Sequence, residues 1–103
     1  MNLQDKVIAI TGGAQGLGLS MALGLAAKGA KFALLDVNAD RLAQAVSQLE
    51  SLGSEARAYP TNVADEASVV ATFDQIVADF GALDGLINNA GILRDGMLLK
   101  VKD

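Results

Sequence analysis

Residues 6–18 read KVIAITGGAQGLG, which is a run of apolar residues followed at once by a segment rich in glycine. The continuous apolar run at residues 6–11 is typical of a strand that is buried on both faces of a sheet. After the glycines, Leu17, Met21 and Leu25 recur at four-residue spacing, which predicts a helix. The segment therefore predicts a buried strand, a tight glycine turn and a helix in direct succession.

The same unit of strand and helix recurs twice more along the chain and is followed by a last strand. We predict the strands at residues 6–11, 31–35, 55–59 and 84–88. Each intervening helix is predicted to end at a glycine, which is a common helix stop signal, namely at Gly29, Gly53 and Gly81. This alternation implies a parallel sheet with right-handed crossovers and with helices on its faces.

The second and third predicted helices have start signals and apolar faces of their own. Asn38 or Asp40 can cap the second helix and Asp65 can cap the third, because their side-chain oxygens accept hydrogen bonds from free backbone N–H groups. The side chains that we expect to be buried are Leu42, Val46 and Leu49 in the second helix and Val69, Phe73, Ile76, Val77 and Phe80 in the third.

Composition excludes several classes of protein. A length of 103 residues allows one domain, and 51% hydrophobic against 19% charged residues excludes a disordered chain. Eight Lys and Arg against 12 Asp and Glu give a formal net charge of −4, so we expect no nucleic-acid partner. The chain has no cysteine and no histidine, which excludes disulfides, His-based zinc sites and catalytic triads that contain histidine, and we expect no metal.

The chain also lacks the signals of export and membrane insertion. The amino-terminal residues hold no positively charged segment ahead of an apolar stretch, so we expect no signal peptide. No apolar run approaches the ~20 residues of a membrane-spanning helix, so we expect a soluble protein with no membrane partner. The absence of cysteine fits a cytoplasmic location.

The glycines of the first turn have a spacing related to that of dinucleotide-binding turns. Gly12 lets the chain turn off the strand, Gly16 lets the backbone approach a pyrophosphate, and Gly18 lets the helix pack close to the sheet. The N-terminus of the helix then directs free N–H groups at the anion. A P-loop is excluded because Leu19 stands where its lysine would be. The remaining alternative is a glycine-rich turn without a ligand.

An aspartate at the end of the second predicted strand is a candidate for binding the same ligand. Asp36 follows Gly18 by about the interval expected of the acid that accepts hydrogen bonds from the adenosine ribose hydroxyls. The alternative is an ordinary solvated or helix-capping aspartate.

Two motifs together resemble the short-chain dehydrogenase/reductase family. The Thr-Gly-x3-Gly-x-Gly pattern occupies residues 11–18, and Asn88-Asn89-Ala90-Gly91 ends the fourth predicted strand. The resemblance covers the whole chain but only the first, cofactor-binding half of the family's fold. It implies a Rossmann-type doubly wound parallel sheet in three α/β/α layers with strand order 3-2-1-4. It also implies an oxidoreductase that moves hydride between nicotinamide and an alcohol or ketone.

The residues that the resemblance assigns to the cofactor follow the predicted strands. They are Gly12, Gln15, Gly16, Leu17, Gly18, Asp36, Asn62, Val63, Asn89, Ala90 and Gly91. Asn62 and Val63 stand where the family usually has Asp-Val or Asp-Leu, whose acid meets the adenine amino group. Asn62 keeps an oxygen atom that can accept this hydrogen bond. The alternative interpretation is that Asn62 is an ordinary turn residue.

We expect the cofactor to be NAD(H) rather than NADP(H). The carboxylate of Asp36 would repel a 2′-phosphate, and Gln15 stands where NADP-preferring relatives often carry Arg or Lys. Residues 91–100 are similar to the 3-oxoacyl-acyl-carrier-protein reductase branch, which implies a 3-oxoacyl thioester substrate. Sister branches of the family that act on other alcohols and ketones have similar sequences at this place. The alternative to a substrate-related segment is an ordinary loop after the fourth strand, with three apolar side chains packed in the core: Met97, Leu98 and Leu99.

The catalytic residues of the family are not recognised in this chain. The family uses a serine, an asparagine and a Tyr-x3-Lys pair, whose tyrosine exchanges a proton with the substrate oxygen. The single tyrosine here, Tyr59, is followed four residues later by Val63, so we interpret it as sheet packing and assign no catalytic residue. We expect that the chain is truncated before the catalytic segment and that it is inactive alone. We expect the complete protein to be a homo-oligomer. The alternative is a non-catalytic dinucleotide-binding module.

Overall fold

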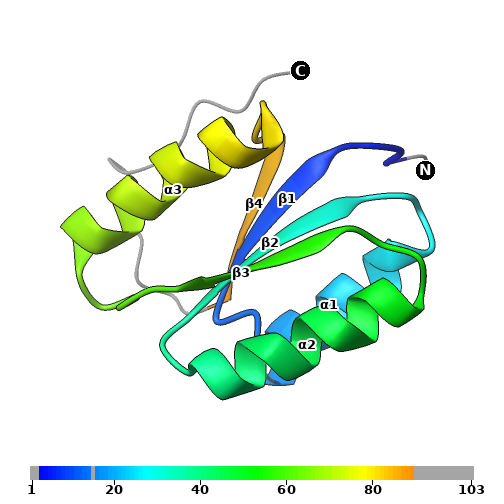
Figure 1. The fold of residues 1–103 in the computed structure, drawn as a ribbon, viewed down its shortest axis with the longest axis horizontal. Coiled ribbons are helices and arrows are strands. Elements are labelled where there is room, and N and C mark those ends of the chain that lie inside the picture. Colours follow the sequence, from blue (N-terminus) through cyan, green and yellow to red (C-terminus); the bar gives the residue numbers. More distant parts are fainter. Residues whose placement is uncertain (1–2, 15, 90–103) are drawn as a thin grey trace.

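A computed structural model describes residues 3–14 and 16–89, in which strands and helices alternate (Figure 1). The elements in chain order are β1 (Val7–Thr11), α1 (Gly16–Ala26), β2 (Lys31–Asp36), α2 (Ala39–Ser51), β3 (Ala56–Pro60), α3 (Glu66–Phe80) and β4 (Gly85–Asn88). The four strands are parallel and lie in the order β3-β2-β1-β4. The predicted sheet and its strand order are therefore confirmed.

The sheet is covered on both faces. Helices α1 and α2 lie on one face and α3 on the other (Figure 1). Successive side chains of β2 alternate between the two layers, so that Phe32 packs with Leu49 of α2 and Leu35 packs with Phe73 of α3. Because both faces of β1 and β2 are buried, these strands need a continuous apolar run rather than an alternating one.

The predicted helix caps and stop glycines are found in the structure, although α1 ends at Ala26, three residues before Gly29. Asn38, rather than Asp40, caps α2, and its Oδ1 accepts a hydrogen bond from the backbone N–H of Arg41 at 2.9 Å. Asp65 caps α3 through two backbone N–H groups of its first turn. Glycines with positive φ follow the three helices: Gly29 (+88°), Gly53 (+88°) and Gly81 (+82°). Among the described residues, no helix has both the length and the apolar character to span a membrane.

The buried face of α1 is made of small residues, and one residue predicted to be buried in α3 is exposed. In α1 the buried residues are Gly18, Ala22 and Ala26, whereas Leu17 is 66% exposed. Gly18 packs against the glycine turn, and Ala22 and Ala26 pack in the core beside β1 and β2. In α3, Val77 is 45% exposed because it lies beside the contact line that faces the sheet, although the rest of the predicted face is turned inward.

Asp84 joins the start of β4 to the start of β1. Its carboxylate oxygen Oδ2 accepts a hydrogen bond from the backbone N–H of Val7 at 2.8 Å, and its own N–H donates to the Val7 carbonyl at 2.8 Å. The side chain therefore completes the pairing of β1 and β4 at the amino end of the sheet, one residue before the strand itself begins.

Candidate cofactor-binding site

The candidate site lies at the carboxyl ends of β1, β2 and β4. In the sheet register, Thr11 of β1 pairs with Leu35 of β2 on one side and with Asn88 of β4 on the other. After β1 the chain continues into α1 on one face of the sheet, whereas it reaches β4 from α3 on the opposite face (Figure 1). Ligands of open parallel sheets bind where the connections diverge in this way.

The glycine turn is tied to β2 through its backbone. Gly12 has a φ of +67°, a conformation that favours glycine, and its N–H donates to the carbonyl of Leu35 at 2.7 Å. The N–H of Gly13 donates to the same carbonyl at 3.2 Å. The turn therefore leaves β1 sharply, as predicted for Gly12, and follows the end of the neighbouring strand.

Gly18 is required by close packing. A Cβ atom at this position would lie 2.5 Å from the carbonyl oxygen of Gly12 and 2.9 Å from Nδ2 of Asn89. Nδ2 of Asn89 itself donates to that carbonyl oxygen at 3.2 Å. The first turn of α1, the glycine turn and the residue after β4 are therefore packed against one another at a point where no side chain fits.

The first residue of α1 is open to a ligand. Gly16 is exposed and has a φ of +57°, and a Cβ built there would have no neighbouring atom within 4 Å. Leu17 beside it is exposed as well. The first turn of α1 carries no acidic side chain, so the partial positive charge at this helix end has no carboxylate beside it in its own turn. This combination of space, free N–H groups and dipole fits a phosphate group.

Asp36 is held rigidly beside the glycine turn. The residue is only 5% exposed, and its carboxylate accepts hydrogen bonds from the N–H of Ala14 at 3.3 Å and from the N–H of Asn38 at 3.2 Å. It is therefore neither a solvated aspartate nor the cap of α2. A carboxylate has about four acceptor positions, so this one retains acceptor capacity for ribose hydroxyls.

Asn62 takes part in a turn in this structure. Its Oδ1 accepts a hydrogen bond from the N–H of Ala64 at 3.1 Å, and its carbonyl accepts one from the N–H of Asp65 at 3.0 Å. The side chain is exposed, whereas Val63 is partly buried against the α3 layer. The contact of Asn62 with adenine stays a prediction.

Two supporting hydroxyl groups were not assigned from the sequence. Thr11 Oγ1 donates to Oδ1 of Asn88 at 2.9 Å, which joins the ends of β1 and β4 beneath the glycine turn. Thr61 is 4% exposed, and its hydroxyl donates to the carbonyl of Tyr59 at 2.7 Å while its N–H donates to the carbonyl of Asp36 at 2.8 Å. Threonine inside or just after an otherwise apolar strand is the signal that could have identified both, because a buried hydroxyl needs a partner.

Several predicted residues fall outside the described part of the chain. These are Gln15, Ala90 and Gly91, together with the tail at residues 91–100 and its apolar residues Met97, Leu98 and Leu99. Among the described residues, no group of three Asp or Glu side chains is arranged to hold a metal ion.

Tyr59 faces α3 and packs with its layer, as the sequence predicted. Its hydroxyl donates to Oδ2 of Asp79 at 2.8 Å. Partial burial, followed by this hydrogen bond to a carboxylate, raises the pKa of Tyr59 well above its ordinary value. The hydrogen bond with Tyr59 in turn lowers the pKa of Asp79. A tyrosine so held in the protonated state is a structural group.

Comparison with known proteins identifies the family. The family model described as short chain dehydrogenase matches residues 6–103. A 3-oxoacyl-[acyl-carrier-protein] reductase of Escherichia coli is 40% identical over 103 residues, which are all of this chain and 41% of that protein. A 2,3-dihydro-2,3-dihydroxybenzoate dehydrogenase of Bacillus subtilis is 38% identical over 101 residues, or 98% of this chain and 39% of that protein.

Solved structures show the same fold with either cofactor. NAD⁺-bound xylitol dehydrogenase superposes with a TM-score of 0.80 at 40% identity, over 84% of this chain and 33% of that one. A short chain dehydrogenase from Burkholderia cenocepacia in complex with NADP gives a TM-score of 0.82 at 40% identity, over 91% of this chain and 39% of that one. The chain thus spans about two fifths of the length of the curated relatives that it matches. With its parallel sheet, glycine turn and paired asparagines, it belongs to the short-chain dehydrogenase family and forms the amino-terminal half of that fold.

Proposed function

We propose that this chain is the cofactor-binding part of an NAD-dependent oxidoreductase that interconverts an alcohol and a ketone. When bound, the nicotinamide supplies or accepts the hydride. The residues described here bind and orient the rest of the dinucleotide: the N-terminus of α1 and Gly16 would receive the pyrophosphate, and Asp36 the adenosine ribose.

The observation that carries this proposal is the burial and hydrogen bonding of the Asp36 carboxylate. Two backbone N–H groups fix its carboxylate at the edge of the glycine turn, and 5% exposure keeps competing water away. A fixed acceptor pair is suited to two ribose hydroxyls, because no side-chain freedom is lost when they bind. The two hydrogen bonds from Ala14 and Asn38 leave acceptor positions on this carboxylate, and these are the positions that we assign to the ribose.

The same carboxylate favours NAD(H) over NADP(H). At ~4 Å and an effective dielectric constant of ~20, two like unit charges repel by about 4 kcal/mol before screening, so a 2′-phosphate is strongly disfavoured there. Arg41 lies one helical turn beyond the cap of α2 and is the nearest basic residue after Asp36 in the sequence. If its side chain reached the phosphate it would offset part of this repulsion, which makes the affinity ratio of the two cofactors the quantity to measure.

The proposed substrate is a 3-oxoacyl thioester. Support comes from the 40% identity to the Escherichia coli 3-oxoacyl-[acyl-carrier-protein] reductase along the whole chain. The relatives of similar identity include dehydrogenases of other substrates, so the substrate class is the part of the proposal that needs its own assay.

A second candidate is a dinucleotide-binding module without catalysis. The observation that favours it is Tyr59, because the single tyrosine of the chain donates its hydroxyl to Asp79 and is followed by no lysine at the catalytic spacing. For these 103 residues alone, the module is the better description.

Binding and turnover measurements test the proposed binding of the dinucleotide and the absence of catalysis in this chain. The chain is expected to bind NADH, detected by fluorescence or calorimetry, and to reduce an acetoacetyl thioester with NADH at a negligible rate, since the loss of acid–base help alone removes about 10²–10⁴-fold. The complete protein is expected to turn the same substrate over and to form a homo-oligomer. Absence of NADH binding would overturn the proposed function, and turnover by the 103-residue chain at the rate of an intact relative would overturn the assignment of no catalytic residue.

A further inference from the structure

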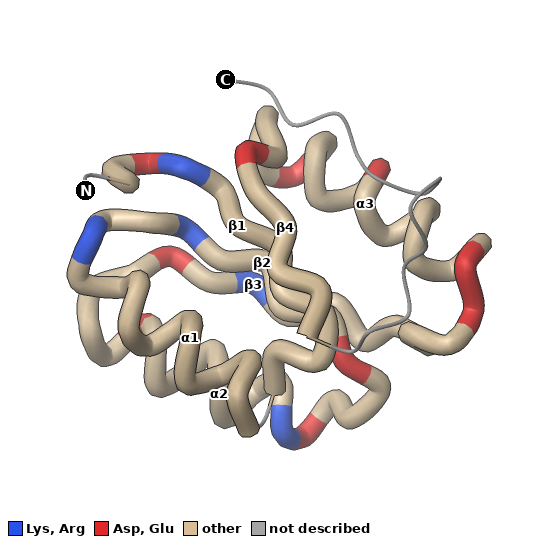
Figure 2. The backbone as a smooth tube through the Cα atoms, turned by 180° about the vertical axis from the view of Figure 1, so that it is seen from behind, with Lys and Arg blue, Asp and Glu red and all other residues tan. Residues whose placement is uncertain are grey.

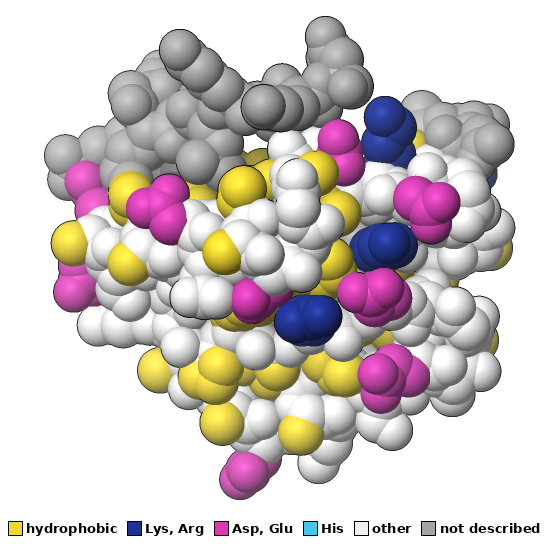
Figure 3. Space-filling model, turned by 45° about the horizontal axis from the view of Figure 1, so that its top comes forward, with side chains coloured by type: hydrophobic (Ala, Val, Ile, Leu, Met, Phe, Trp, Pro, Cys, Tyr) yellow, Lys and Arg dark blue, Asp and Glu magenta, His cyan; other side chains and the backbone are white. Residues whose placement is uncertain are grey.

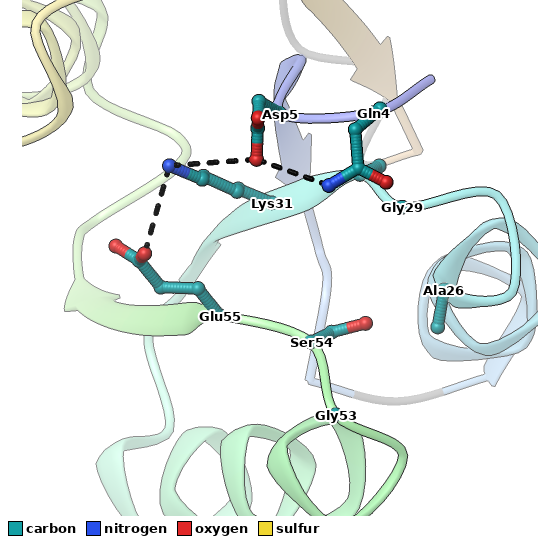
Figure 4. Close-up of a pocket in the computed structure, with 9 residues that line it drawn as sticks. Gln4, Asp5, Ala26, Gly29, Lys31, Gly53, Ser54 and Glu55 are labelled. Carbon is teal, nitrogen blue, oxygen red and sulfur yellow. Dashed lines mark hydrogen bonds and ion pairs between the residues drawn. The ribbon is translucent and has the colours of Figure 1, made fainter. Parts of the chain in front are cut away.

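The two ends of β3 are joined to the rest of the molecule by different groups. Where β3 begins, the carboxylate of Glu55 lies 3.8 Å from Nζ of Lys31, which also lies 4.0 Å from the carboxylate of Asp5 (Figure 4). Figure 2 shows acidic and basic segments next to one another at this end of the sheet. Where β3 ends, two hydroxyl groups meet instead, because Oγ1 of Thr61 and Oγ1 of Thr72 are 3.1 Å apart. This hydroxyl pair joins the residue after β3 to the middle of α3.

Thr61 connects the two residues that are predicted to bind the adenosine. Its N–H donates to the carbonyl of Asp36 at 2.8 Å, and Asn62 follows it directly in the chain. Asp36 is thus held at its carbonyl by Thr61 and at its carboxylate by the N–H of Ala14 in the glycine turn. A displacement of Thr61 would therefore reach both the ribose acceptor and the residue predicted to meet adenine.

The number of protons gives the direction of the hydrogen bond within the hydroxyl pair. The two hydroxyls carry one proton each but make three contacts: Thr61 with the carbonyl of Tyr59 at 2.7 Å, Thr72 with the carbonyl of Ser68 at 2.9 Å, and the two hydroxyls with each other. The contact with Tyr59 is the shortest and takes the proton of Thr61. The proton between the two hydroxyls must then come from Thr72, which is the donor of the pair.

The second acceptor of Thr72 can give up this proton. The carbonyl of Ser68 lies inside α3, where it also accepts a backbone N–H of the helix, so it keeps a hydrogen bond when Thr72 donates to Thr61. The hydroxyl of Thr61 has no such substitute: without the proton of Thr72, two oxygen atoms would face each other at 3.1 Å. The position of Thr61 therefore depends on the hydroxyl of Thr72.

We propose that Thr72 is a positioning residue for the adenosine half of the cofactor. Its hydroxyl holds Thr61 and, through Thr61, the backbone next to Asp36 and Asn62 in the geometry that binds the adenosine. The inference rests on the proposed function and adds to it a residue of α3 that acts through another residue. Valine has nearly the shape of threonine and lacks the donor, so Thr72→Val isolates the contribution of the hydroxyl, and Thr72→Ser restores it.

Amide hydrogen exchange tests the positioning without any cofactor. In Thr72→Val we expect the N–H of Thr61, which donates to the carbonyl of Asp36, to exchange about tenfold faster than in the unmodified chain. In Thr72→Ser its exchange should be as slow as in the unmodified chain. Unchanged exchange in Thr72→Val would overturn the inference. So would an equal rise at the N–H of Val7, at the other end of the sheet, because it would show a general loss of stability.

Calorimetry with NADH and with 5′-AMP, which contains the adenosine half alone, tests the consequence for binding. Thr72→Val should raise both dissociation constants about fivefold, the effect of one ordinary hydrogen bond, and Thr72→Ser should restore them. The control is Asp84→Ala, which removes a hydrogen bond at the opposite end of the sheet and should leave both constants unchanged.

The outcomes separate this inference from the proposed function. If the unmodified chain bound neither NADH nor 5′-AMP, the proposed function would be wrong, and the role of Thr72 toward the cofactor would be wrong with it. If the unmodified chain bound both, three results would overturn the role of Thr72 alone: equal binding by Thr72→Val, binding by Thr72→Ser as weak as that by Thr72→Val, or an equal loss in Asp84→Ala.

Discussion

The two ends of the sheet are both held by backbone hydrogen bonds, but they carry different charged groups. At the carboxyl ends, the glycine turn, Asp36 and Asn89 are joined by hydrogen bonds of 2.7–3.3 Å around a carboxylate that is 5% exposed. At the amino ends, backbone hydrogen bonds such as that from the Lys31 N–H to the Lys6 carbonyl, at 2.8 Å, are accompanied by ion pairs of 3.8–4.0 Å between partly exposed side chains. Among the described residues, Asp36 is the only charged residue that is buried, and it lies at the same end as the open first residue of α1.

Gly18→Ala should have the largest effect, because it forces a Cβ to within 2.5 Å of the carbonyl oxygen of Gly12 in the glycine turn. We expect a loss of about 3 kcal/mol in the free energy of unfolding and a loss of NADH binding. Denaturant unfolding and NADH calorimetry measure the two quantities.

Its matched control is Gly24→Ala in the same helix, where a Cβ meets no atom within 4 Å. That variant should gain about 0.5–1 kcal/mol from the higher helix propensity of alanine. If the two alanine variants were equally stable, the close packing at Gly18 would not be what determines the turn.

Asp84→Ala should have an intermediate effect, because it removes a partly buried acceptor that joins the starts of β1 and β4. The change leaves the N–H of Val7 without its acceptor, so we expect a loss of about 1–2 kcal/mol in unfolding free energy. Asp84→Asn keeps an oxygen acceptor and should recover most of it, while Asp74→Ala on the exposed side of α3 should be neutral. A loss for Asp84→Ala no larger than for Asp74→Ala would contradict this role.

Lys31→Met should have the smallest effect. It removes the ion pairs of Lys31 with Asp5 and Glu55, but these are long and partly solvated, so the unfolding free energy should change by less than about 1 kcal/mol. A melting experiment at low and high salt checks this. A loss as large as that of Asp84→Ala would mean that these ion pairs stabilise the fold as much as the hydrogen bond of Asp84 does.

Part of the fold could be predicted from the sequence. The strands, helix caps and helix ends follow from local signals such as the apolar run at residues 6–11, Asn38, Asp65 and the glycines after each helix, whereas the strand order came from the resemblance to a family. The roles of Gly18 and Asp36 follow from their spacing within a known kind of turn.

Contacts between distant segments could not be predicted in this way. The bond of Asp84 to Val7 joins residues 77 positions apart, as does that of Thr11 to Asn88. The small buried face of α1 could not be predicted either, because the close approach of Gly18 to the carbonyl of Gly12 depends on the three-dimensional path of the turn. Val77 is exposed together with Val70, which precedes it by seven residues in α3. Figure 3 shows hydrophobic and acidic side chains side by side on one face of the molecule.

The central claim is that the fixed carboxylate of Asp36 binds the adenosine ribose and selects NAD(H), and the affinity ratio of NADH to NADPH tests it most directly. We expect the protein to bind NADH at least about tenfold more tightly than NADPH, since even a residual repulsion of about 1.4 kcal/mol gives that factor. Asp36→Ala should narrow the ratio, whereas Asp40→Ala, which removes an exposed carboxylate from the first turn of α2, should leave it unchanged. Equal affinities in the unmodified protein, or a ratio that Asp36→Ala does not alter, would contradict the claim.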